Sequence, residues 1–156
     1  MSDYEGPPPA IDSTRVVAFA STVDPVLWTE RQNLSGGMQI GRVPWLVISQ
    51  ELGGATAGEF RLLHCDQMWA AVGASRASTI DALREQAEEA YPGISGRWTY
   101  VDVSDAEAED YMRRTFPLDV CSFCDRVRNT SMMKGRRASI CNDCVEQMHS
   151  LIHGNG

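Results

Sequence analysis

The sequence lacks long apolar runs and a leader-like N-terminus. No stretch of its 156 residues approaches the roughly 18 apolar residues that a membrane-spanning helix needs. The first nine residues, Met-Ser-Asp-Tyr-Glu-Gly-Pro-Pro-Pro, contain neither the basic region nor the apolar region of a signal peptide. Together these absences predict a cytoplasmic protein.

Recognisable catalytic motifs are also missing. The sequence contains no Gly-x-x-x-x-Gly-Lys-[Ser/Thr] phosphate loop and no His-Glu-x-x-His metal motif. His64 and Cys65 are adjacent, but neighbouring side chains on a strand face opposite sides, so they cannot form a nucleophile–base pair. We therefore predict no catalytic or cofactor-binding residue and favour a non-enzymatic protein. An enzyme that uses a cleft of the N-terminal domain remains an open alternative.

Cysteines are few, but four of the five form two Cys-x-x-Cys pairs. Cys121 and Cys124 are separated from Cys141 and Cys144 by residues 125–140. This spacing is typical of a four-cysteine zinc site, because each turn directs two thiolates toward one point of a tetrahedron. Two disulfides would need an oxidising compartment, which nothing in the sequence indicates. The sequence predicts one structural Zn²⁺ and a free Cys65.

The net charge of −7 is unevenly distributed. Residues 1–120 hold nine Lys/Arg against eighteen Asp/Glu, whereas residues 121–156 hold five against three. We call residues 1–120 the body. Its acidic charge disfavours general binding to a phosphate backbone and fits a basic protein partner. The basic cluster consists of Arg126, Arg128, Lys134, Arg136 and Arg137. It could contact nucleic acid, but no aromatic stacking surface accompanies it, and we favour compensation of the negative Zn(Cys)₄ centre and the acidic body.

The apolar pattern predicts a small α+β domain over residues 14–116, after a disordered tail over residues 1–13. Its mostly antiparallel sheet should carry two helices on one face. Capping boxes at Ser78 with Asp81 and at Ser104 with Glu107 open the two helices, and Asp66 and Gln67 turn a hairpin. The expected strands cover residues 15–20, 43–49, 60–65, 68–73 and 98–103. A finger over residues 120–156 completes the chain, with a hairpin that turns near Lys134 and a C-terminal helix.

The cysteine stretch resembles the ClpX-type C4 zinc finger, the N-terminal module of a bacterial AAA+ unfoldase. The first knuckle is Cys121-Ser-Phe-Cys124 and the second is Ile140-Cys-Asn-Asp-Cys-Val145, followed by a helix. The resemblance covers residues 120–152, and the stretch between the knuckles is shorter than in the family. It implies zinc binding, dimerisation and recognition of adaptors or substrates for this finger. The missing phosphate loop excludes the unfoldase activity itself.

We hypothesise a bacterial-type protein-interaction module, for example an immunity or antitoxin-like inhibitor or an adaptor. The alternative is a nucleic-acid-associated regulator that uses the basic finger hairpin. The apolar side chains of the finger exceed what one metal tetrahedron can cover, so some should pack on the body or on a second finger. His149 and His153 are four residues apart on the final helix and are interpreted as an exposed pair without function. Trp28, Trp45, Trp69 and Trp98 should lie in the core, and any two that share an open sheet face would form an interaction patch.

Overall fold

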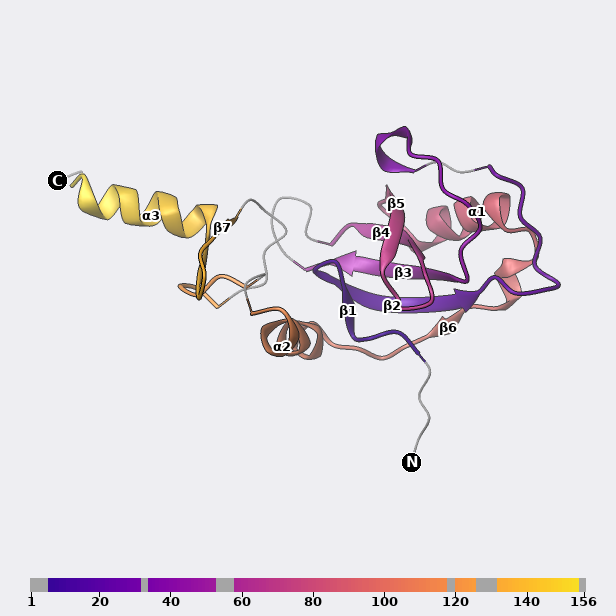
Figure 1. Cartoon of the computed structure of the whole chain (residues 1–156), viewed down its shortest axis with the longest axis horizontal. Coiled ribbons are helices and arrows are strands. Elements are labelled where there is room, and N and C mark those ends of the chain that lie inside the picture. Colours follow the sequence, from indigo (N-terminus) through magenta and orange to yellow (C-terminus); the bar gives the residue numbers. More distant parts are fainter. Residues whose placement is uncertain (1–5, 32–33, 53–57, 118–119, 126–131, 155–156) are drawn as a thin grey trace, which may run out of the picture.

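An antiparallel sheet of six strands forms the larger part of the computed structural model, which describes residues 6–31, 34–52, 58–117, 120–125 and 132–154. The strand order is β1-β2-β3-β4-β5, and β6 pairs with β2 next to β1. The sheet is curled, and the finger lies at one end of it (Figure 1). Its strands are β1 (Ala10–Ile11), β2 (Thr14–Ser21), β3 (Trp45–Glu51), β4 (Phe60–Cys65), β5 (Ala71–Ala77) and β6 (Thr99–Tyr100).

Both faces of the sheet are apolar. On β3, Leu46 and Ile48 belong to the core on one face, while Val47 between them belongs to a cluster on the other face. This follows from the two-residue side-chain period of a strand. A bulge between Val16 and Ala18 shifts the register of β2, so that these two buried residues contribute to opposite faces.

Helix α1 (Ile80–Ala90) covers the first face. Its buried side chains are Leu83, Ala87 and Ala90, which pack against the sheet. The helix starts one residue later than the sequence predicted. Thr79 is the N-cap, and its hydroxyl accepts a hydrogen bond from the Ala82 N–H at 3.2 Å. The helix ends before Pro92, as expected from the missing N–H and restricted φ of proline.

Helix α2 (Asp105–Thr115) begins at the predicted cap, where the Ser104 hydroxyl accepts from the Glu107 N–H at 3.1 Å. Its buried residues Ala108 and Met112 form a cluster with Ala10 of β1 and Val120. Because Val120 directly precedes the first knuckle, this helix connects the sheet to the finger.

Several predicted boundaries differ from the structure. Residues 10 and 11 were expected in a disordered tail, but they form β1 and pair with β2. Residues 12 and 13 make the turn between these strands, whereas residues 1–5 lie outside the described part. The strand expected over residues 98–103 is only the two-residue β6, and β5 starts three residues later than expected. In each case the strand boundary is set by pairing with a neighbouring strand, which the local propensity of the residues does not show.

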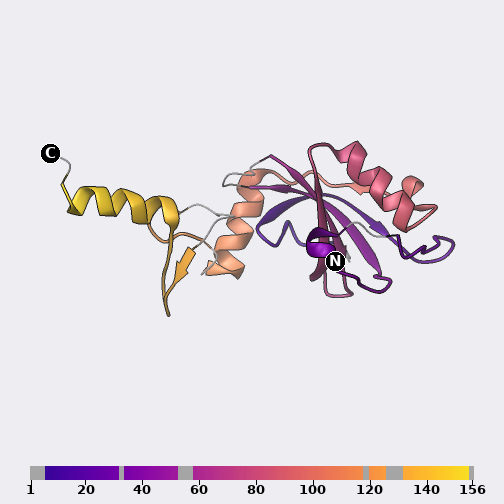
Figure 2. The ribbon, with the colours of Figure 1, turned by 90° about the horizontal axis from the view of Figure 1, so that it is seen from above.

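The finger contains β7 (Met132–Lys134), β8 (Ser139–Cys141) and α3 (Asn142–Ile152). Helix α3 points away from the sheet, and the C-terminus lies at the far end of the molecule (Figure 2). Arg113 of α2 contacts the first knuckle, since its Nε lies 3.2 Å from a carboxylate oxygen of Asp125. The α+β class and the antiparallel sheet are confirmed, and α3 adds a third helix to the two of the sheet domain. The expectation that both of these helices cover one face was wrong: α1 packs on β3, β4 and β5, whereas α2 packs on β1 and β2 and lies on the other side of the sheet (Figure 1). Within the described residues, no helix is long and apolar enough to cross a membrane.

Candidate metal centre

The first knuckle is a tight turn that follows Val120. Residues 122–124 form the turn, and the Asp125 N–H donates to the Cys121 carbonyl at 2.9 Å. Asp125 adopts a left-handed backbone with φ of 60°, a conformation that Asp tolerates better than most residues. This turn brings the side chains of Cys121 and Cys124 to one side.

The second knuckle joins a hairpin to a helix. Strands β7 and β8 pair antiparallel, with Met132 opposite Cys141, and the Gly135 N–H closes their turn on the Ala138 carbonyl at 2.7 Å. Cys141 ends β8 and is also the N-cap of α3, so Cys144 lies in the first helical turn. The predicted hairpin and helix are both present.

Two serines that sequence reasoning did not single out hold the knuckles together. The Ser122 N–H donates to the Ser139 carbonyl at 2.8 Å, and the Ser139 N–H donates to the Ser122 hydroxyl at 3.0 Å. Ser139 is 2% exposed whereas Ser122 is exposed, so these bonds are partly shielded from water. The one sequence feature that could have pointed to these hydrogen bonds is the hydroxyl residue inside the first Cys-x-x-Cys turn. Serine side chains commonly form hydrogen bonds with nearby backbone groups.

The four predicted cysteines meet at one point, with all sulfur atoms within 4.8 Å of one another. The sulfurs of Cys121 and Cys144 are 3.7 Å apart, and those of Cys124 and Cys141 are 3.9 Å apart. A tetrahedron with metal–sulfur bonds of about 2.3 Å has edges of about 3.8 Å. All five cysteines are free thiols, and these separations far exceed the roughly 2.05 Å of a disulfide. The arrangement is that of a metal-binding cluster.

The surroundings of Cys121 favour a thiolate. Burial by itself would raise the pKa of this thiol, but the backbone N–H groups of Cys141, Cys124 and Phe123 outweigh burial and lower the pKa to about 6. Burial and the hydrogen bonds of the neighbouring thiols raise the pKa of Cys144 to about 12. These backbone N–H groups therefore favour the negatively charged form of Cys121. A metal ion would compensate that charge and lower the pKa of the remaining thiols.

The structure separates the other residues that the sequence singled out. His64 and Cys65 lie on opposite faces of β4, with His64 near the ring of Tyr91 and Cys65 in the second cluster. Burial, followed by the charges of Asp12 and Asp66, raises the pKa of Cys65 to about 12, which disfavours a nucleophilic thiolate.

His149 lies on α3 and His153 is the C-cap of that helix; both are exposed, with ring centroids 4.3 Å apart. They belong to no cluster of three or more potential ligands within the described residues. Arg126 and Arg128 lie outside the described part of the chain.

The tryptophans divide between the two sheet faces. Trp28 and Trp98 pack against the core beneath α1, whereas Trp45 and Trp69 pack on the opposite face. The latter pair is stacked, with ring centroids 4.5 Å apart. Two tryptophans thus share the sheet face that α1 does not cover.

In comparisons with known proteins, no family model matches the chain, and no curated protein or solved structure matches it.

Proposed function

We propose that this chain is a protein-interaction module whose finger is held by one structural zinc ion. The observation that carries this proposal is the sulfur quartet, whose 3.7 and 3.9 Å separations match the edges of a zinc–thiolate tetrahedron. Zinc suits four thiolates in tetrahedral geometry, and iron is the other ion common in such a set. With four cysteines as ligands, no position would remain for a reactive water, so the ion would have a structural role.

Unpaired apolar side chains on the finger support a binding role. Met133, Leu151 and Ile152 are 70%, 76% and 78% exposed, and Phe123 of the first knuckle is 59% exposed. Of the finger side chains expected to pack on the body or on a second finger, Met133, Leu151 and Ile152 are not covered by the body, which leaves a second finger or another partner to cover them. Their exposure supports a partner, because exposed large apolar side chains that lie together mark interaction surfaces, and Leu151 and Ile152 are adjacent at the end of α3. A second copy of this finger is one such partner, which would give a homodimer.

The acidic body provides the second basis for the proposal. Its excess of Asp and Glu over Lys and Arg would steer a basic protein toward it. An inhibitor of a basic toxin, in the manner of an immunity protein or an antitoxin, is one specific form of this function. An adaptor protein is another form.

Native mass spectrometry of the tagged full chain, purified from its own cells with and without a zinc chelator, tests this proposal. We expect one zinc per chain and a second protein, or a second copy, that dissociates from a Leu151→Ser/Ile152→Ser variant. The matched control is Glu85→Gln/Glu89→Gln, which changes two exposed residues of α1 far from the finger. A zinc-free chain would contradict the metal assignment, and a bare monomer under all conditions would contradict the binding function.

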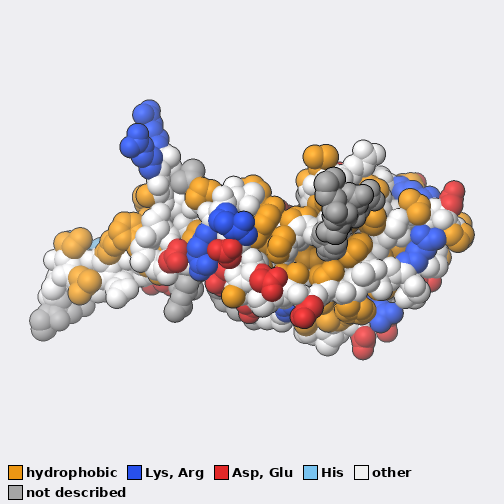
Figure 3. All heavy atoms as spheres, turned by 90° about the horizontal axis from the view of Figure 1, so that it is seen from below, with side chains coloured by type: hydrophobic (Ala, Val, Ile, Leu, Met, Phe, Trp, Pro, Cys, Tyr) orange, Lys and Arg blue, Asp and Glu red, His pale blue; other side chains and the backbone are white. Residues whose placement is uncertain are grey.

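A nucleic-acid-associated regulator is the second candidate, and it is favoured by the tip of the finger hairpin. Basic side chains protrude from the finger beyond the rest of the surface (Figure 3). The described basic residues of the tip are Lys134, Arg136 and Arg137, all exposed. This candidate requires binding to labelled DNA or RNA that weakens steeply with salt and is reduced by Arg136→Gln/Arg137→Gln. Absent or salt-insensitive binding would eliminate it.

A further inference from the structure

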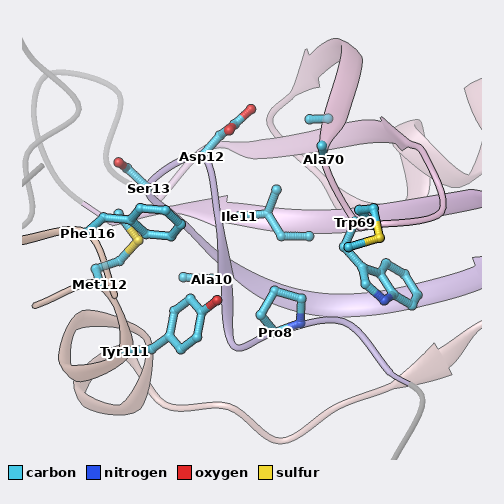
Figure 4. Close-up of a pocket in the computed structure, with 12 residues that line it drawn as sticks. Pro8, Ala10, Ile11, Asp12, Ser13, Trp69, Ala70, Tyr111, Met112 and Phe116 are labelled. Atoms are coloured by element: carbon cyan, nitrogen blue, oxygen red, sulfur yellow. The ribbon is translucent and has the colours of Figure 1, made fainter. Parts of the chain in front are cut away.

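A cavity of about 330 Å³ opens on the sheet face that α1 leaves uncovered. It lies between β1, α2 and the turn that joins β4 to β5 (Figure 4). Most of its lining is apolar, and the main side chains are Pro8, Ile11, Trp69, Tyr111, Met112 and Phe116. We call it the Trp69 pocket. Its volume is at the lower end of the range for ligand sites, so it has room for one or two side chains.

Aromatic contacts support the walls of the Trp69 pocket. Trp69 stacks on Trp45 at 4.5 Å and meets the edge of Phe19 at 5.8 Å. On the other wall, the rings of Tyr111 and Phe116 are edge to face at 6.3 Å. Aromatic side chains held in this way lose little conformational freedom on binding, which makes them effective anchors.

The backbone around the pocket is unusual. Asp12, Ser13 and Trp69 have φ values of 50°, 61° and 63°, and all three line the pocket. They are three of the five non-glycine residues with positive φ in the described ranges. The position of Trp69, just after a tight turn, is one where glycine would be least strained. A bulky tryptophan at this position indicates that its side chain is needed there despite the backbone strain. Such strain is concentrated at ligand-binding sites.

The mouth of the pocket is negatively charged. Asp12 lines the pocket, and it is the only charged residue among the described ones that do so. Asp66 lies at the base of the same turn, where its carboxylate accepts from the Met68 and Ala70 N–H groups at 2.8 and 3.0 Å. By strand register the β1–β2 and β4–β5 turns are at opposite ends of the sheet, but both reach the pocket, whose lining includes Asp12 of the first turn and residues 68–71 from the second. An apolar pocket beside two carboxylates is complementary to an apolar group that stands next to a cation.

We propose that the Trp69 pocket docks a segment of a protein partner that presents a large apolar side chain beside a lysine or arginine. Apolar surface continues beyond the cavity, since Met68 and Phe116 at its rim are 84% and 47% exposed. That extent favours a polypeptide over a small molecule, which would be enclosed on most sides. This inference rests on the proposed function as a protein-interaction module, and it assigns a binding site on the body, apart from the finger.

Selection of random linear heptapeptides displayed on phage, against the full-length metal-loaded protein, tests the inference. We expect the enriched peptides to share one large apolar residue with Lys or Arg within two positions of it. The best peptide, made synthetically, should shift the NMR amide signals of Ile11, Ala70 and Met112. Its affinity should fall about fivefold to tenfold for Asp12→Asn/Asp66→Asn, because each lost charge contributes modestly at a partly exposed site.

These substitutions are chosen to keep the fold. Asparagine tolerates the left-handed backbone of position 12, and its side-chain oxygen can accept the two hydrogen bonds that Asp66 accepts. Met68→Ser removes an apolar contact from a residue that is 84% exposed, and it should also weaken binding. The matched control is again Glu85→Gln/Glu89→Gln, which removes two charges from α1, on the other face of the sheet, and should leave the affinity unchanged.

Three results would overturn the inference. They are the absence of any enriched peptide, a consensus without a cation, and NMR shifts confined to the finger. The proposed function is tested separately, by the protein that co-purifies in native mass spectrometry. If that protein binds the Asp12→Asn/Asp66→Asn/Met68→Ser variant as tightly as the unaltered chain, the pocket assignment fails while the interaction function stands.

Discussion

At the residue scale, His64 shows how the fold alters the chemistry of a side chain. It is 2% exposed beneath α1, and its Nδ1 has no hydrogen-bond partner among the described residues. Burial lowers the pKa of His64 from 6.5 to about 4. Between these values the unfolded chain binds a proton that the folded chain does not, so stability falls as the pH decreases from 6.5 toward 4. The full pKa difference corresponds to about 3 kcal/mol.

We predict that His64→Leu removes this pH dependence. At pH 7 the variant should be about as stable as the unaltered chain or more stable, because an unpaired buried nitrogen is replaced by an apolar group. Below pH 6 the variant should become the more stable protein. Urea unfolding at pH 7, 6, 5 and 4.5 measures the free energy of unfolding of both proteins. Subtracting one from the other removes the pH dependence that they share. The control is His149→Ala, which changes an exposed histidine on α3. The prediction would be contradicted if the free energies of unfolding of His64→Leu and the unaltered chain changed in parallel with pH.

At the element scale, the start of α1 illustrates a boundary that the sequence left ambiguous. Ser78 and Thr79 are both hydroxyl residues suited to an N-cap, and Ser78 has the acidic partner Asp81 of a capping box. The structure uses Thr79 instead. Leu83 and Ala87 would face the sheet with either start, so the apolar stripe does not distinguish the two caps. The path by which the chain enters from β5 is set by the tertiary structure.

We predict that Thr79→Ala lowers the free energy of unfolding by about 1 kcal/mol, the usual cost of losing an N-cap. Ser78→Ala, the matched control one residue earlier, should change it by less than about 0.5 kcal/mol, because the exposed Ser78 caps no N–H in the structure. Chemical denaturation of both variants measures the two values. If Ser78→Ala lowered the free energy of unfolding more than Thr79→Ala does, Ser78 would be the N-cap and the capping box with Asp81 would start α1.

At the scale of the whole molecule, the sheet domain and the finger are stabilised by different means. The sheet domain has apolar clusters on both faces of its sheet. The buried residues of the finger cluster are three cysteines, with Cys124, Met132 and Ile140 partly buried around them. So small a cluster cannot offset the ordering of the chain, whereas zinc binding to such peptides provides about 10–16 kcal/mol. The finger should therefore fold only with its metal.

We predict that Cys141→Ser abolishes stoichiometric metal binding and unfolds the finger, while the sheet domain stays folded. Serine is itself a good N-cap, so the substitution removes a ligand without removing the cap of α3. Metal analysis and NMR spectra should show less than one ion per chain and random-coil shifts for residues 132–154 only. Cys65→Ala, which alters the buried cysteine outside the cluster, should retain one ion. A fully loaded Cys141→Ser protein would show that the ligand assignment is wrong.

The sequence by itself determined the features that depend on local spacing and period. The two Cys-x-x-Cys pairs predicted a common metal cluster, because each pair must turn its sulfurs to the same side. The Ser104 cap, the end of α1 before Pro92 and the strand Phe60–Cys65 followed from equally local rules. Adjacency on that strand also placed His64 and Cys65 on opposite faces, which removed a thiol site from consideration.

Only the tertiary structure decided which distant segments meet. It paired residues 10 and 11 with β2, joined Ser122 to Ser139, and brought Trp69 onto Trp45 on the sheet face opposite α1. The Trp69 pocket needs β1, α2 and the β4–β5 turn together, and no local pattern encodes the distance between them. The physical reason is that such contacts depend on how the curled sheet and α2 pack, which is a property of the whole chain and not of any short window.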